Sequence, residues 1–219
     1  MARRSLDLGT ADERPHAVMV CSHGIQSYAR WFEPFGERFA TLGVAVWAFN
    51  RPASGLGPQQ QSPLHVNRWK EWIEQLHRVA RAAQRPGVPT YVIGSSWGAR
   101  PALAAVAGDQ RDFAGAILLN PVLKTRRDFA FFVQSWFGIA IFLAPNESMR
   151  IPLRECDYTP RQATRVGWLR DPRMTTRMTY GYFVQTLSMR CAVNQDLPLI
   201  RQPVLALLAM TIRSSCLSA

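Results

Sequence analysis

The chain is poor in lysine and lacks any long apolar run. Lys70 and Lys124 are its only lysines, so arginine supplies nearly all of the 26 basic residues, which outnumber 15 acidic residues and give a formal charge of +11. The arginines stand singly or in pairs without a nucleic-acid-binding motif, so we expect a solvated surface and no nucleic-acid partner. The most apolar run, residues 131–144, is too short to cross a bilayer.

Cysteine pairs and a secretory leader are also lacking. The first eighteen residues contain three arginines, Arg3, Arg4 and Arg14, but no apolar core of a signal peptide. No two cysteines form a C-x-x-C pair, so no metal and no redox motif are predicted; they are Cys21, Cys156, Cys191 and Cys216. We therefore expect a soluble cytoplasmic protein with reduced cysteines, no transmembrane segment and no cofactor.

Strand-like and helix-like patterns alternate along the chain. Short apolar runs typical of buried strands cover residues 16–24, 44–50, 90–96, 114–122 and 203–209. Apolar residues at helical spacing occupy residues 28–43 and 66–83, and an alanine-rich helix is expected after residue 98. This order predicts an α/β fold, with a mostly parallel sheet covered by helices on both faces.

Residues 124–201 interrupt this alternation. They are rich in arginine, methionine and aromatic residues, and an insertion of this length between two strands predicts a helical cap or lid. Its aromatic side chains either face a lipophilic pocket or form the ordinary core of a helical subdomain, and the sequence leaves both interpretations open. We thus predict a core at 1–123, a cap at 124–201, and a core strand followed by an aberrant tail at 202–219.

A candidate nucleophile lies between two glycines. Residues 94–98, Gly-Ser-Ser-Trp-Gly, fit G-x-S-x-G, in which a serine occupies a strained turn between a strand and a helix. Gly94 and Gly98 would let the strand and the helix approach closely. On this pattern Ser96 is the nucleophile, and the backbone N–H of Trp97 points at the oxyanion of a tetrahedral intermediate. The motif alone also fits a plain strand-to-helix turn.

The loop after the first apolar strand supplies the second oxyanion donor in sites of this type. The candidate donor is the backbone N–H of Ile25, and Gly24 would let the chain come close. The side chain of His23 is expected to hold the loop rather than to transfer a proton. His65 and His77 are expected on the surface or in helix packing.

Several segments together resemble the α/β-hydrolases of the monoacylglycerol lipase and lysophospholipase group, of the serine aminopeptidase S33 type. They are "SHGIQSYARWFEPFGERFATLGVAVWAFNRPASGLG", "HVNRWKEWIEQL", "VPTYVIGSSWGARPALA", "FAGAILLNPVL" and, later, "RQPVLALLA". The resemblance implies a serine hydrolase that cleaves carboxylic esters through an acyl-enzyme on Ser96. It implies a small lipid-like ester as substrate and transient contact with a membrane surface. The family tends to have an acidic residue and a second glycine where this chain reads "NRPASG".

The residues that would activate Ser96 are not found. In this fold the triad acid and then the histidine follow the serine. All four histidines (His16, His23, His65 and His77) precede Ser96, and no acidic residue follows Asp196. We therefore expect the triad acid and histidine, with the last strand and helix of the fold, to be absent from this chain, and its activity to be impaired.

The codons of Met210 and Thr211 suggest how this arose. They read ATG-ACN, and the frame that starts one base earlier encodes aspartate, in a Gly-x-Asp pattern if the Leu208 codon ends in G. The hypothesis is a frameshift near Leu208. The alternative function is a non-catalytic protein of the same fold that binds an acyl ligand or a partner through the cap.

Overall fold

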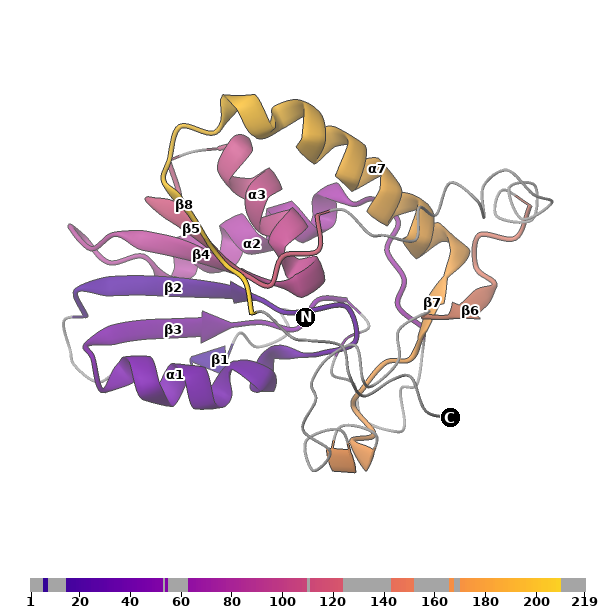
Figure 1. Cartoon of the computed structure of the whole chain (residues 1–219), viewed down its shortest axis with the longest axis horizontal. Helices are drawn as coiled ribbons and strands as arrows, with labels where there is room; N and C mark the ends of the chain where they lie inside the picture. The colour runs from indigo at the N-terminus through magenta and orange to yellow at the C-terminus, as the bar shows by residue number, and fades with distance from the viewer. Residues whose placement is uncertain are drawn as a thin grey trace.

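The computed structural model of the chain describes residues 6–7, 15–52, 54, 63–109, 111–123, 143–151, 166–167 and 170–209. Its main feature is a six-stranded sheet with the strand order β1-β3-β2-β4-β5-β8 (Figure 1). The five predicted strands all form: β2 (Ala17–Ser22), β3 (Val44–Ala48), β4 (Thr90–Ser95), β5 (Gly115–Leu119) and β8 (Val204–Leu207). They run parallel to one another, whereas β1 (Leu6–Asp7) pairs antiparallel with β3.

Helices cover both faces of this sheet (Figure 1). The 3-10 helix η1 (Ala29–Phe32) and α1 (Glu33–Ala40) lie on one face, and α2 (Lys70–Ala83) and α3 (Ala99–Ala107) on the other. On α2, one of the predicted helices, the buried residues lie on one face, namely Trp72, Leu76, Val79, Ala80 and Ala83. Trp69 and Ile73, which the spacing also placed on the apolar face, are only partly buried.

Strand β2 illustrates why the sheet needs two covers. All six of its residues are buried. Val18 and Val20 belong to the core on the α2 and α3 side, whereas Met19 and Cys21 belong to the core on the α1 side. A strand that buries both faces is typical of parallel sheets in α/β proteins, so the predicted fold class is confirmed.

Parts of the segment predicted as a cap are outside the described residues, namely 124–142, 152–165 and 168–169. In the described part, β6 (Ser148–Arg150) pairs antiparallel with β7 (Arg177–Thr179), a strand pair that was not expected. Helix α7 (Tyr180–Asp196) follows β7 and packs on α3 (Figure 1). The boundaries of the cap stay a prediction.

Strand β8 forms one edge of the sheet. Val204, Leu205 and Leu207 on it are 42%, 52% and 50% exposed. Residues 210–219, which the frameshift hypothesis concerns, lie outside the described residues.

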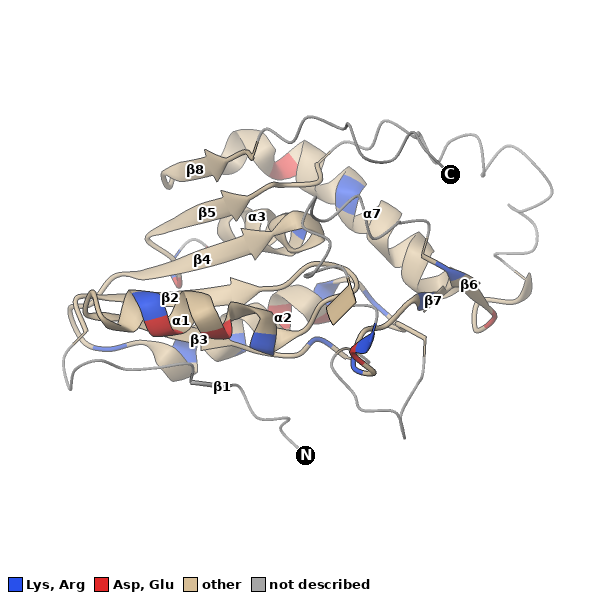
Figure 2. Cartoon of the chain, turned by 60° about the horizontal axis from the view of Figure 1, so that its bottom comes forward, with Lys and Arg blue, Asp and Glu red and all other residues tan. Residues whose placement is uncertain are grey.

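Charged residues of both signs are interspersed on α1 and α2 (Figure 2). Arg30 pairs with Glu33 at 3.2 Å, and Arg68 lies 3.8 Å from Glu71. Exposed pairs of this kind suit a solvated surface and contribute little to stability. Among the described residues, no helix combines the length and the hydropathy needed to span a membrane.

Candidate active site

Ser96 occupies a sharp turn between strand β4 and helix α3. The strand ends at Ser95, a short 3-10 helix, η3, covers Ser96–Gly98, and α3 begins at Ala99. Ser96 has a φ of +52°, in the left-handed region that residues with a side chain rarely adopt. Such a conformation costs about 1–2 kcal/mol and persists only where the surroundings hold it.

The two glycines that flank Ser96 are required by packing. A β-carbon on Gly94 would lie 2.5 Å from the Cα of Ala99, so β4 and α3 could not approach as they do. A β-carbon on Gly98 would lie 2.2 Å from the carbonyl oxygen of Ser22, at the end of β2. Both obstacles are backbone atoms, which cannot rotate away. The spacing of the G-x-S-x-G motif therefore has a steric cause in this fold.

The loop after β2 lies beside Ser96. Strands β2 and β4 are neighbours, with Ser22 opposite Gly94. A β-carbon on Gly24 would lie 3.6 Å from the Cβ of Ser96, which is van der Waals contact. The fold thus brings together the loop that contains Ile25 and the turn that contains Ser96.

The side chain of His23 is committed to this loop. It is 1% exposed, its Nδ1 donates a hydrogen bond to the Gly24 carbonyl at 2.8 Å, and its Nε2 accepts one from the Arg51 N–H at 3.3 Å. Burial, together with the positive charge of Arg51, lowers the pKa of His23 well below 6.5. The ring is neutral, and neither nitrogen is free to take a proton from Ser96.

Arg51 is a residue that the sequence did not reveal. It is 1% exposed, and its guanidinium donates hydrogen bonds to the carbonyls of His23 and Gly24, the latter at 2.6 Å. The guanidinium also lies 4.5 Å from the centre of the Trp97 ring. Burial lowers the pKa of Arg51 to about 10, so the side chain is still a cation at neutral pH. Its segment, "NRPASG", contains no sequence signal for these contacts.

Trp97 connects the turn to helix α7. Its side chain is buried, and its ring centre lies 4.8 Å from that of Trp72 and 5.8 Å from that of Tyr182. Trp72 comes from α2 and Tyr182 from the first turn of α7. The aromatic cluster therefore packs α2 and α7 against η3, the short helix that begins at Ser96.

The segment after β5 also contacts this turn. The N–H of Val122 donates a hydrogen bond to the carbonyl of Ser96 at 3.2 Å. Asn120, at the end of β5, has a φ of +45°, and its side chain accepts a hydrogen bond from the N–H of Ala209 at 2.6 Å. The carboxyl-terminal ends of β2, β4, β5 and β8 thus lie together at one end of the parallel strands.

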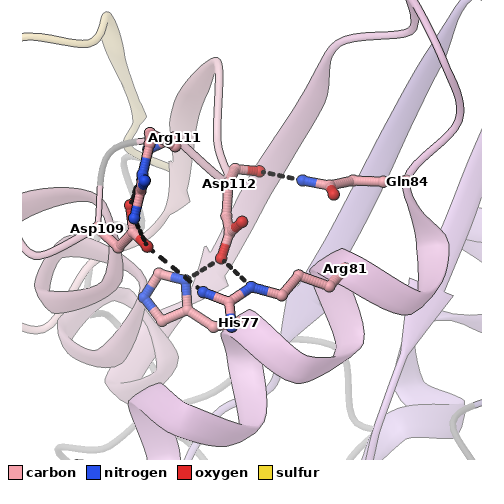
Figure 3. A network of polar contacts seen from close by, with 6 residues as sticks. All are labelled: His77, Arg81, Gln84, Asp109, Arg111 and Asp112. Carbon is pink, nitrogen blue, oxygen red and sulfur yellow. Dashed lines mark hydrogen bonds and ion pairs between the residues drawn. The ribbon is translucent and has the colours of Figure 1, made fainter.

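One histidine, His77, is paired with a carboxylate, that of Asp112, in the segment before β5 (Figure 3). The Nδ1 of His77 lies 2.7 Å from Asp112, and Arg81 donates to the same carboxylate at 3.0 Å. Asp112 precedes β5, whereas Ser95 is opposite Leu119 at the end of β5. The pair therefore cannot serve Ser96, and it agrees with the helix-packing role expected of His77.

The other two histidines are also placed. His65 lies with its Nδ1 3.1 Å from the hydroxyl of Thr179, and His16 directly precedes β2. Among the hydrogen bonds of the described residues, none joins a histidine to the Ser96 hydroxyl. In the same part of the chain, no group of three histidine, cysteine or acidic side chains could hold a metal ion.

Comparison with known protein families places the chain in one of them. The family model described as serine aminopeptidase, S33, matches residues 13–211. The chain belongs to the serine aminopeptidase S33 family. This confirms the family that the sequence motifs indicated.

Relatives and solved structures agree with this assignment. Human monoglyceride lipase is 24% identical over 200 residues, which are 88% of this chain and 64% of that protein. Monoacylglycerol lipase from Mycolicibacterium smegmatis is 25% identical over 54% of this chain and 42% of its own length. The chain thus spans less than two thirds of these relatives. The crystal structure of Paleococcus ferrophilus monoacylglycerol lipase superposes with a TM-score of 0.75 at 17% identity, over 95% of this chain and 77% of that chain, and shows the α/β-hydrolase fold.

Proposed function

We propose that this protein is a serine hydrolase of carboxylic esters, with Ser96 as nucleophile and the N–H groups of Ile25 and Trp97 as oxyanion donors. The substrates are monoacylglycerol-like or lysophospholipid-like esters. The Ser96 oxygen attacks the ester carbonyl carbon, the C–O bond to the alcohol breaks, and the acyl group stays on Ser96 until water hydrolyses it. Gly24, Gly94, Gly98 and His23 support the backbone of the site.

The observation that carries the proposal is the left-handed conformation of Ser96 between two glycines that packing requires. Strain that is retained at one serine next to a glycine loop suits a nucleophile that must project from its turn. Membership of the S33 family and similarity to monoacylglycerol lipases support the choice of reaction and of substrate class.

We further propose that the 219-residue polypeptide turns substrate over slowly. None of its histidines follows Ser96, and both nitrogens of His23 are engaged. The Ser96 proton therefore passes to solvent. Removal of triad members lowers kcat by roughly 10⁴–10⁶, while oxyanion donors and binding retain about 10³-fold acceleration over water.

The test is covalent labelling by a fluorophosphonate, in which the Ser96 oxygen forms a bond to phosphorus and fluoride leaves. Ser95 is a matched control because it is the last residue of β4 and directly precedes Ser96. Mass spectrometry after long incubation should find the adduct on Ser96 in the parent and in Ser95→Ala, and none in Ser96→Ala. Equal labelling of Ser95 and Ser96, or none of either, would overturn the proposal. Ester and amide substrates with the same acyl chain then establish which bond is cleaved.

The second candidate is a non-catalytic protein of this fold that binds an acyl ligand or a partner through the segment 124–201. It is favoured by the fact that both ring nitrogens of His23 are occupied. A chain that binds a fatty acyl ligand in titration calorimetry but leaves Ser96 unlabelled would establish it.

A further inference from the structure

We propose that Arg51 is a positioning residue for the oxyanion loop: by holding the carbonyl of Gly24, it orients the N–H of Ile25 toward the side of the loop on which Ser96 lies. The inference rests on the proposed function of Ile25 and Ser96. It concerns a residue that the motif of the site does not include.

Three donors converge on the carbonyl oxygen of Gly24. The Gly24 carbonyl accepts hydrogen bonds from Arg51 at 2.6 Å, from the His23 ring at 2.8 Å and from the Ser27 hydroxyl at 3.2 Å. The bond from Arg51 carries a full charge and is therefore the strongest of the three. The direction of this carbonyl is thus fixed from several sides.

The direction of the Gly24 carbonyl also sets the direction of the next N–H group. The Gly24 carbonyl and the Ile25 N–H belong to one planar trans peptide unit, so the N–H points opposite to the carbonyl. Gly24 contacts Arg51 through its oxygen, and a β-carbon on it would contact Ser96. Among the hydrogen bonds of the described residues, none uses the Ile25 N–H. This donor is therefore free for a ligand.

The two contacts of Arg51 with the loop require a guanidinium. Arg51 holds the carbonyls of two successive residues, His23 and Gly24, with two different nitrogens. Lysine has a single nitrogen and cannot donate to the two carbonyls from two separate nitrogens. A neutral side chain offers no charge-assisted hydrogen bond to either carbonyl. The guanidinium also lies over the Trp97 ring, with its carbon 4.5 Å from the ring centre. Among the described residues, no carboxylate pairs with Arg51.

The experiment compares Arg51→Met and Arg51→Lys with Arg100→Met. Arg100 is a matched control because it is also buried (6% exposed) and burial also lowers its pKa to about 10, but it lies on α3 without a hydrogen bond to the loop among the described contacts. In Arg51→Met, NMR order parameters of residues 24–27 should fall from about 0.85 to below about 0.6. Arg51→Lys should give an intermediate fall, and Arg100→Met none.

The fluorophosphonate reaction supplies the second readout. The maximal rate of Ser96 modification should fall roughly 10–100-fold in Arg51→Met and less in Arg51→Lys, because an oxyanion donor acts on the transition state. The concentration for half-maximal rate should change less than about twofold. A loss of structure alone would instead reduce the fraction of reactive protein.

The two readouts separate the possible failures. If Ser96 is not labelled in the parent, the proposed function is wrong, and the order parameters alone decide the role of Arg51. If residues 24–27 stay rigid in Arg51→Met, the inference is overturned. If that variant does not fold, Arg51→Lys decides, and a lysine variant equal to the parent in both readouts overturns it.

Discussion

The hydroxyl of Tyr28 donates a hydrogen bond to the carboxylate of Asp171, which lies 143 positions further along the chain. Arg173 donates to the same carboxylate at 2.9 Å, and its guanidinium lies 4.6 Å from the centre of the Tyr28 ring. Tyr28 immediately precedes η1 and follows the loop beside Ser96. The segment predicted as a cap is therefore anchored to the core close to the candidate site.

This contact predicts a dependence of stability on pH. Partial burial opposes ionisation of Asp171, but hydrogen bonds from Arg173 and Tyr28 outweigh it and lower the pKa to about 2. A lowered pKa in the folded state contributes stability that is complete above the unfolded pKa of about 3.9 and is lost as the pH falls toward 2. The contribution is about 1 kcal/mol, because Arg173 is partly exposed.

Urea unfolding between pH 5 and pH 2 measures the contribution of Asp171 to stability. The free energy of unfolding of the parent should fall more steeply than that of Asp171→Asn. Asp109→Asn is the control: the Asp109 side chain is 29% exposed against 13% for Asp171, so its effect should be smaller and should vanish in high salt. Parallel curves for the parent and Asp171→Asn would contradict the prediction.

A second prediction concerns the motif glycines. Gly98→Ala places a β-carbon against the carbonyl oxygens of Ser22 and His23, at 2.2 and 2.6 Å. We expect a loss of about 3 kcal/mol in the free energy of unfolding. Gly167→Ala, where a β-carbon meets nothing within 4 Å, should change it by less than about 0.5 kcal/mol. Equal unfolding midpoints for the two variants would show that the strand ends move apart at little cost.

A third prediction concerns the proton acceptor of Ser96. If solvent takes the proton, the labelling rate should rise about tenfold per pH unit from pH 6 to 9 without a plateau. Added imidazole should raise the rate in proportion to the concentration of its neutral form, since neutral imidazole can accept the Ser96 proton. A plateau near pH 7 in the absence of imidazole would reveal an internal base and refute this account.

A fourth prediction concerns the edge strand β8. An exposed apolar edge favours association between chains, so Leu205→Lys should reduce concentration-dependent association in light scattering. Leu42→Lys is the matched control, since Leu42 is 51% exposed against 52% for Leu205 but lies outside the sheet. The same decrease in both variants would point to added charge rather than to the edge strand.

The network around Asp112 gives a fifth prediction. Asp112→Ala leaves His77 and Arg81 without their shared acceptor and should cost about 1–3 kcal/mol of stability. Labelling of Ser96 should be unchanged in the folded variant, because the network lies before the start of β5, whereas Ser96 follows the end of β4. A labelling rate that falls more than the folded fraction would show that the Asp112 network is coupled to the turn at Ser96.

The features that the sequence predicted well are those encoded over short distances. The strand at Thr90–Ser95, the turn at Ser96 and the helix from Ala99 follow from an apolar run, a glycine pair and an alanine-rich segment that adjoin one another. The stripe on α2 follows from its spacing in the same way.

The features that were missed depend on contacts between distant segments. Nothing within "NRPASG" indicates that Arg51 reaches carbonyls 27 and 28 positions earlier. Strands β6 and β7 have three residues each, and only their pairing distinguishes them from loop. Tyr182 lay in a segment interpreted as cap, yet its ring packs on Trp97 behind the candidate nucleophile. Periodicity within one segment carries no information about which other segment covers it.

The neighbouring positions of β2 and β4 also bear on how the chain tolerates insertions. Adjacent strands are held about 4.8 Å apart by their hydrogen bonds, so the spacing between Gly24 and Ser96 does not depend on how much chain joins the two strands. The turn at Arg85–Val88 precedes the start of β4, whereas Ser96 follows its end. A β-carbon on Gly87, in this turn, would meet nothing within 4 Å. Extra residues, or a whole inserted domain, could enter at this turn and leave the candidate nucleophile and its loop in register.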